Sequence, residues 1–93
     1  MIVGVLRVEL YIGESASLKD KRRVLSSLTG RIRHRFNVSI AEVEHHDTWN
    51  RATLGVALVT NDRRHADRVL STIVEFIGRA ADAELTDYAI ELL

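Results

Sequence analysis

The sequence has no cysteine among its 93 residues. This absence excludes disulfide bonds, thiolate zinc sites, iron–sulfur clusters and a cysteine nucleophile. It is in keeping with a cytoplasmic protein, which is the localisation we expect. No apolar run approaches the roughly 18 residues of a membrane-spanning helix, so we expect no membrane partner. The first seven residues lack the basic start and cleavage site of a secretion signal and have the pattern of a strand.

Aromatic residues and catalytic motifs are scarce as well. Aromatic side chains make up 5% of the chain, and no predicted strand carries the aromatic pair on which RNP-type RNA-binding sheets stack bases. The chain has no phosphate-binding loop, no nucleophile elbow and no carboxylate pair in an evident pocket. His45 and His46 are weak metal candidates, because neighbouring strand residues point to opposite faces. We therefore expect neither an enzyme nor a cofactor.

Apolar residues, in contrast, are spread over the whole length and make up 46% of it. This content and the chain length predict one globular domain spanning residues 1–93. Apolar stripes at helical spacing predict two helices, from Leu18 to about Phe36 and from about residue 62 to Gly78. Strand patterns cover four segments, residues 2–12, 38–46, 52–60 and 83–93.

Local signals support these boundaries. Ser17 with Asp20 three residues later predicts the N-cap of the first helix, and Asn61 or Asp62 that of the second. Gly30 costs the first helix about 1 kcal/mol relative to alanine, so we expect a frayed end or close packing there. The phase of the second strand is irregular, which a bulge near Ala41 would explain.

The element order predicts an α+β fold, the ferredoxin-like βαββαβ plait. Two right-handed crossovers placed side by side put both helices on one face of a four-stranded antiparallel sheet. We expect the first and third strands in the centre, since the third is apolar or small on both faces. The other sheet face is left open, and its apolar residues are interrupted by Arg7 and Glu9.

Charge is distributed unevenly along this chain. The 13 basic and 13 acidic residues cancel, yet the segment from Leu18 to Phe36 carries +6 and the remainder −6. Such a segment favours contact with an anion, above all with nucleic-acid phosphates. The alternative is a solvated helix face paired with acids such as Asp20. The candidate contacts are Lys19, Lys21, Arg22, Arg23, Arg31 and Arg35.

Four segments of the chain together carry a resemblance to a known family: S-L-K-D-K-R-R-V at 17–24, R-F-N-V-S-I-A-E-V at 35–43, D-T-W at 47–49 and the strand at 52–59. With these segments the chain resembles the bacterial YlxP-like family, a domain of unknown function. The resemblance runs through essentially the whole chain and implies the ferredoxin-like plait. Genes of this family tend to lie among those for transcription termination, translation initiation and ribosome maturation. The resemblance therefore implies work on RNA or the ribosome, and it supplies no reaction.

Three functional hypotheses remain. The first is a non-enzymatic module whose basic first helix contacts RNA or a ribosomal particle through phosphates, with no DNA specificity. The second is a protein-interaction or homodimerisation domain using the open sheet face, with Trp49, Tyr11 and Arg7 as partner contacts. Trp49 either folds back over the core edge or anchors a partner. The third, an enzyme for a small anionic substrate at the start of the first helix, has no supporting constellation.

Overall fold

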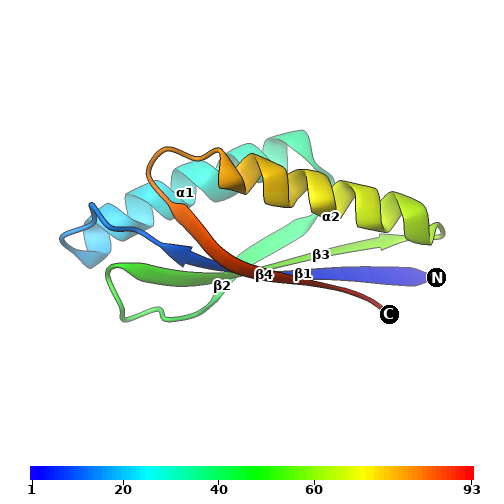
Figure 1. Cartoon of the computed structure of the whole chain (residues 1–93), viewed down its shortest axis with the longest axis horizontal. Coiled ribbons are helices and arrows are strands. Elements are labelled where there is room, and N and C mark those ends of the chain that lie inside the picture. The colour runs from blue at the N-terminus through cyan, green and yellow to red at the C-terminus, as the bar shows by residue number, and fades with distance from the viewer.

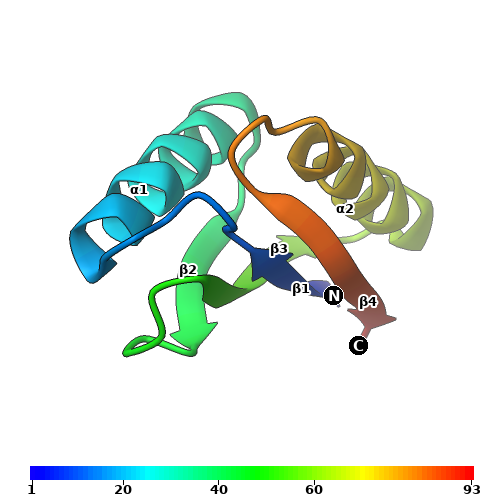
Figure 2. The same ribbon diagram turned by 60° about the vertical axis from the view of Figure 1, so that its left-hand side comes forward.

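The chain folds in the predicted order of strand, helix, strand, strand, helix, strand, and a computed structural model describes all residues 1–93. The four strands form one antiparallel sheet in the order β2-β3-β1-β4. Both helices lie on the same face of this sheet (Figures 1 and 2), which confirms the ferredoxin-like plait. The elements are β1 (Ile2–Tyr11), α1 (Leu18–Arg35), β2 (Ser39–Glu44), β3 (Arg51–Thr60), α2 (Arg63–Gly78) and β4 (Glu84–Leu92).

Side-chain caps fix where the two helices begin. Ser17 Oγ accepts the N–H of Asp20 at 3.1 Å, and Asp20 Oδ2 accepts the N–H of Ala16 at 3.2 Å. Asp62 Oδ1 accepts the N–H groups of Arg64 and His65. The bonds from the amides of Asp20, Arg64 and His65 satisfy N–H groups in the first turns of the helices, which have no backbone acceptor there. The predicted cap of α1 is confirmed, and Asp62 is the N-cap of α2.

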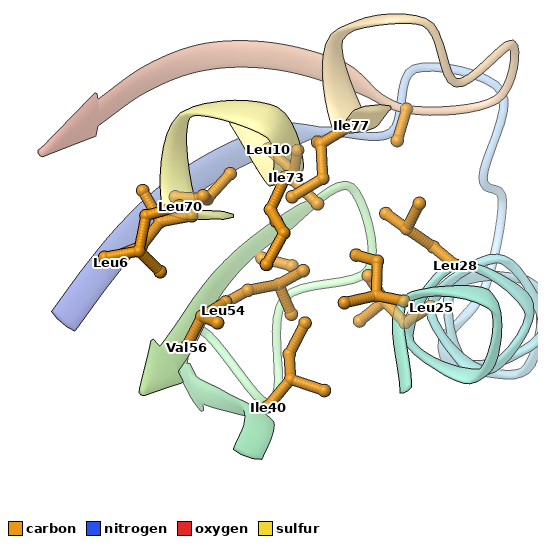
Figure 3. Packing of buried hydrophobic residues seen from close by; sticks show 14 of the residues in the cluster. Leu6, Leu10, Leu25, Leu28, Ile40, Leu54, Val56, Leu70, Ile73 and Ile77 are labelled. Atoms are coloured by element: carbon orange, nitrogen blue, oxygen red, sulfur yellow. The ribbon is translucent and has the colours of Figure 1, made fainter. Parts of the chain in front are cut away.

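The hydrophobic core lies between the sheet and the two helices (Figure 3). β1 and β3 pair in an unbroken register from Ile2 opposite Thr60 to Tyr11 opposite Arg51. Alternate residues of both strands therefore point toward the helices, and each large apolar side chain buried there contributes about 1.5–3 kcal/mol. The fully buried members of this cluster include Leu6, Val8, Leu54, Val56, Leu28, Ile32, Leu70, Ile73 and Ile77.

β2 is shorter than predicted, and its bulge lies further along the chain. The register between β2 and β3 shifts between Glu42 and Glu44, so the predicted bulge is present and its extra residue is Val43, two residues beyond Ala41. The strand ends at Glu44 because His45 adopts a φ of 66°, which leaves the extended region. Thr48 N–H then donates to His45 O at 3.0 Å and closes a turn.

Lys21 is the largest fully buried side chain, with 1% of its surface exposed. Its Nζ donates to the carbonyl oxygens of His45 and Thr48, both at 2.6 Å, and lies 2.7 Å from Glu42 Oε2. The three oxygens match the three N–H groups of an ammonium. Glu42 Oε2 is itself buried and has no hydrogen-bond partner beyond this ion pair. The expectation that Lys21 contacts a nucleic acid is therefore wrong, because its charge is compensated inside the protein.

Replacement of Lys21 should destabilise the fold. Lys21→Met keeps an unbranched apolar stem but leaves a buried carboxylate and two carbonyls without their cation. We expect the free energy of unfolding to fall by about 3 kcal/mol, measured by urea denaturation followed by circular dichroism. Lys19→Met, on the exposed side of the same helical turn, should stay within about 0.5 kcal/mol of wild type. Equal stability of the two variants would contradict this role of Lys21.

Candidate nucleic-acid interface

The outward side of α1 carries a row of exposed cationic side chains. Its inward side is formed by Lys21, Leu25, Leu28, Thr29 and Ile32, which are buried. Helical periodicity then directs the remaining positions toward solvent. We call the exposed cationic residues the basic face of α1; it extends over about 24 Å of helix. The basic face consists of Lys19, Arg22, Arg23, Arg31, Arg33 and Arg35, with His34 exposed beside them.

None of these side chains forms an ion pair. The three ion pairs of the molecule involve only Arg7 and Lys21 as cations. Asp20, the one acid of α1, accepts the amide of Ala16. Arg33 donates to the carbonyl of Ile40 in β2 at 2.8 Å, a neutral partner. The interpretation of the basic face as a surface neutralised by nearby acids is therefore not supported.

The fold turns the uneven charge of the sequence into two differently charged sides. α1 carries seven Lys or Arg residues and one acid, and α2 carries three Arg residues and two acids. The two helices together have a net charge of +7, and the strands and connections carry −7. Because both helices cover the same face of the sheet (Figure 2), the helical layer is the positive side of the molecule. A polyanion is attracted to this side at long range.

A groove of about 550 Å³ lies between α1 and the end of α2. The guanidinium carbons of Arg31 and Arg35 lie 5.7 and 5.2 Å from the centre of the Phe76 ring, within the range of cation–π contacts. Phe36 packs edge-on against the same ring, with centroids 6.1 Å apart. The groove is lined by Ser26, Ser27, Gly30, Arg31, His34 and Arg35 of α1 and by Phe76 of α2.

Sequence reasoning missed the part that Phe76 plays in this site. The signal was present in the sequence: Phe76 lies beside the stripe of Ala66, Leu70, Ile73 and Ile77 that α2 buries. A large aromatic residue next to such a stripe, and not within it, faces a neighbouring element or solvent. Here the neighbour is α1, which reaches the ring with two arginines.

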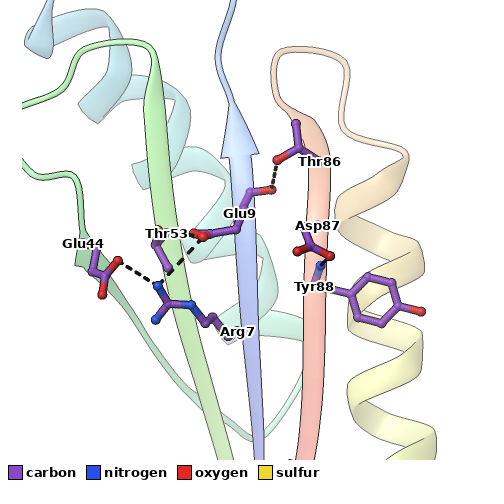
Figure 4. A network of polar contacts seen from close by, with 7 residues as sticks. All are labelled: Arg7, Glu9, Glu44, Thr53, Thr86, Asp87 and Tyr88. Carbon is purple, nitrogen blue, oxygen red and sulfur yellow. Dashed lines mark hydrogen bonds and ion pairs between the residues drawn. The ribbon is translucent and has the colours of Figure 1, made fainter.

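The middle of the open sheet face is covered by a polar network (Figure 4). Arg7 Nη2 donates to Glu44 Oε2 at 2.7 Å and lies 3.9 Å from Glu9 Oε2. Arg7 pairs in register with Gly55, so its side chain crosses β3 beside a residue that has no side chain. The Thr53 hydroxyl donates to the Glu9 carboxylate. Arg7, a candidate partner contact, is thus already bound within the sheet.

The apolar part of the open face is smaller than the sequence suggests. Its largest part is the end formed by Val3, Val5, Ala57 and Val59, of which Val59 is 68% exposed. Val43 covers Gly55, where an added Cβ would lie 3.1 Å from Val43 Cγ1. This end, with the exposed Val59, lies beyond the polar network of Arg7 and Glu9.

The two aromatic partner candidates lie near the other end of the sheet. Tyr11 pairs with Arg51 in register and is 43% exposed. Trp49, in the connection before Arg51, is 47% exposed and stacks on no other aromatic ring. Trp49 is therefore not among the residues that pack against the hydrophobic core.

The sequence predicted His45 and His46 within a strand. In the structure both residues lie in the turn that follows β2. His46 Nε2 lies 3.1 Å from the carbonyl oxygen of Glu42. No three His, Asp or Glu side chains are close enough together to hold a metal ion. Neither helix has the length and apolar content needed to span a bilayer.

Comparisons with known proteins agree with the resemblance seen in the sequence. The family model described as "Protein of unknown function (DUF503)" matches residues 3–90. The chain is 35% identical over 85 residues to "Uncharacterized protein YlxP" of Bacillus subtilis (strain 168). The aligned residues make up 91% of this chain and 92% of that protein.

Among solved structures, the chain aligns with a dimeric ferredoxin-like protein of unknown function from Thermobifida fusca YX. The alignment covers 98% of this chain and 90% of that one. Its identity is 11% and its TM-score 0.44, a similarity too weak to bear on partners or assembly. The family match, in contrast, spans nearly the whole chain. The chain therefore belongs to the DUF503 family of proteins of unknown function, and its YlxP-like resemblance is confirmed.

Proposed function

We propose that this protein is a non-enzymatic RNA-binding module that contacts RNA, on the ribosome or a precursor of it, with the basic face of α1. The observation that carries this proposal is the set of exposed cations on α1 without acidic partners. Lys and Arg contacts to phosphates release counterions and supply most of the sequence-independent affinity for nucleic acids. A helix face of this kind binds backbone, and its affinity depends strongly on salt.

The arrangement of small residues supports a close approach of the RNA backbone. Between the cations at the two ends of the basic face, α1 exposes Ser26, Ser27 and Gly30. No long side chain stands between the two ends. The exposed side of α1 has no Asn or Gln, the residues that read adenine edges. Backbone contact without sequence preference is the mode that these residues favour.

Reversal of charge at the start of the basic face should abolish most RNA binding. We expect Arg22→Glu/Arg23→Glu to weaken binding of a ribosomal RNA fragment at least tenfold at low salt, because two phosphate contacts become repulsive. Arg63→Glu/Arg64→Glu is the matched control: it changes the net charge equally, at exposed positions in the first turn of α2. The start of α2 and the start of α1 lie at opposite ends of the molecule (Figure 1). Fluorescence anisotropy measures both. Unchanged binding by the α1 variant, or equal losses in both variants, would contradict the proposal.

Salt dependence provides a second, independent measurement. The logarithm of the binding constant falls with the logarithm of salt concentration, by about 0.7–0.9 per phosphate neutralised. Arg22→Ala/Arg23→Ala should therefore reduce this slope by about 1.5, equally for RNAs of different sequence. Co-sedimentation of the wild-type protein with ribosomal subunits at two salt concentrations tests the same contacts on the assembled particle. A slope that the substitutions leave unchanged would speak against phosphate contacts by these arginines.

A second candidate function is self-association through the apolar end of the open sheet face. The exposed Val59 is the observation that favours it, since an exposed apolar patch on a sheet is a common subunit contact. The wild-type protein should then sediment as a dimer at high micromolar concentration, and Val59→Lys as a monomer. A wild-type protein that sediments as a monomer under these conditions would exclude this candidate.

A further inference from the structure

We infer that the groove between α1 and α2 takes one unpaired nucleotide of RNA, with its base between the helices and its phosphate on Arg31 and Arg35. The inference rests on the proposed function, because it names the feature of RNA that the basic face would recognise. It also revises the expectation of contact through phosphates alone. The sequence analysis searched for base-stacking aromatic residues on the strands only. The groove is formed by α1 and α2, on the side of the sheet opposite the open face.

Gly30 points to a ligand at this groove. It lies in the interior of α1, where glycine costs about 1 kcal/mol relative to alanine. The fold gives no reason for it: no glycine has a positive φ, and an added Cβ at Gly30 would meet no atom within 4 Å. Neither packing nor backbone conformation requires glycine here. Its one structural consequence is additional space in the groove that it lines.

The walls of the groove suit a nucleotide better than a bare anion. Most of its lining surface is apolar, and Phe76 is the one hydrophobic residue among those that line it. A hydrated anion gains little from such walls, whereas a base is flat and apolar on its faces and carries its phosphate alongside. The groove has a volume of about 550 Å³ and is open toward solvent, so a nucleotide could enter it without a change of the fold.

The two arginines are held in place before a ligand arrives. Both guanidinium groups lie over the Phe76 ring, and Arg31 Nε donates to Ser27 O at 3.4 Å. A guanidinium can stack on a base with its plane and bind a phosphate oxygen pair with its edge. Because their conformations are already restricted, less entropy is lost on binding.

Gly30→Leu tests the groove without changing charge. The leucine side chain enters open space and improves the helix propensity, so the fold should be retained. Two oligoribonucleotides of equal length are used as probes, one single-stranded and one in a duplex, whose paired bases cannot enter the groove. Gly30→Ala, which adds one methyl group, is the intermediate variant, and Gly78→Leu, which fills open space at the end of α2, is the control.

We expect Gly30→Leu to weaken single-strand binding about fivefold or more, the loss that corresponds to one stacked base. Duplex binding should not change, Gly30→Ala should weaken single-strand binding less than Gly30→Leu does, and Gly78→Leu should bind like wild type. Wild-type affinity of Gly30→Leu for the single strand would overturn the groove inference, while RNA binding that still depends on Arg22 and Arg23 would leave the proposed function standing. Absence of binding to either RNA by the wild-type protein would overturn both.

A free nucleotide separates base recognition from anion binding. In NMR titrations of the wild-type protein, adenosine 5′-monophosphate should shift the amide signals of Ser27, Gly30 and Phe76. Inorganic phosphate at the same concentration should not, and Gly30→Leu should abolish the shifts. Equal shifts with inorganic phosphate would overturn the inference in favour of a plain anion site. Nucleotide binding by a protein that binds no RNA would overturn both RNA assignments and leave a site for a free nucleotide.

Discussion

The buried ammonium of Lys21 is the contact on which the arrangement of the basic face depends. It joins the first turn of α1 to β2 through Glu42 and to the β2–β3 connection through the carbonyls of His45 and Thr48. By fixing which side of α1 faces inward, it also fixes that Lys19, Arg22 and Arg23 face outward. A buried cation is costly unless it is fully paired, and here each of its N–H groups has an oxygen partner. The buried contacts of Lys21 thus help to set the rotation of α1, and with it the outward direction of Lys19, Arg22 and Arg23.

Most of the fold could be predicted from the sequence because its signals are local. Ser17, Asp62 and the alternation along β1 and β3 act within a few residues, and their predictions are confirmed. The bulge at Val43 and the positive φ of His45 could not be placed in this way, since both depend on how β2 meets a neighbouring strand and a distant lysine. The sequence did contain one sign of Lys21: it stands in the apolar stripe between Leu18 and Leu25, at helical spacing.

The candidate site was predictable in its charge but not in its shape. Charge is a property of single residues, so counting them was sufficient to identify the basic segment. The groove arises from two helices that are distant in sequence, and only the packed structure brings Arg31 and Arg35 onto Phe76. In the same way, the sequence showed Arg7 as an interruption of the open face, whereas the structure shows it bound to Glu44 across β3. In both places, pairing across elements decides whether a charged side chain remains available.

The basic face of α1 and the apolar end near Val59 lie on opposite sides of the sheet, so a partner on one does not block the other. The helical layer is positive, and the strands and connections carry the compensating negative charge. A polyanion therefore orients the molecule with its helices forward and its sheet outward. Association through the apolar end near Val59 would leave both basic faces exposed, one on each side of a symmetric pair. Two such faces on one particle would raise affinity for a long RNA by linking two binding events, provided that the RNA can span both. The two proposed contacts are thus compatible in geometry, because they would use opposite sides of the sheet.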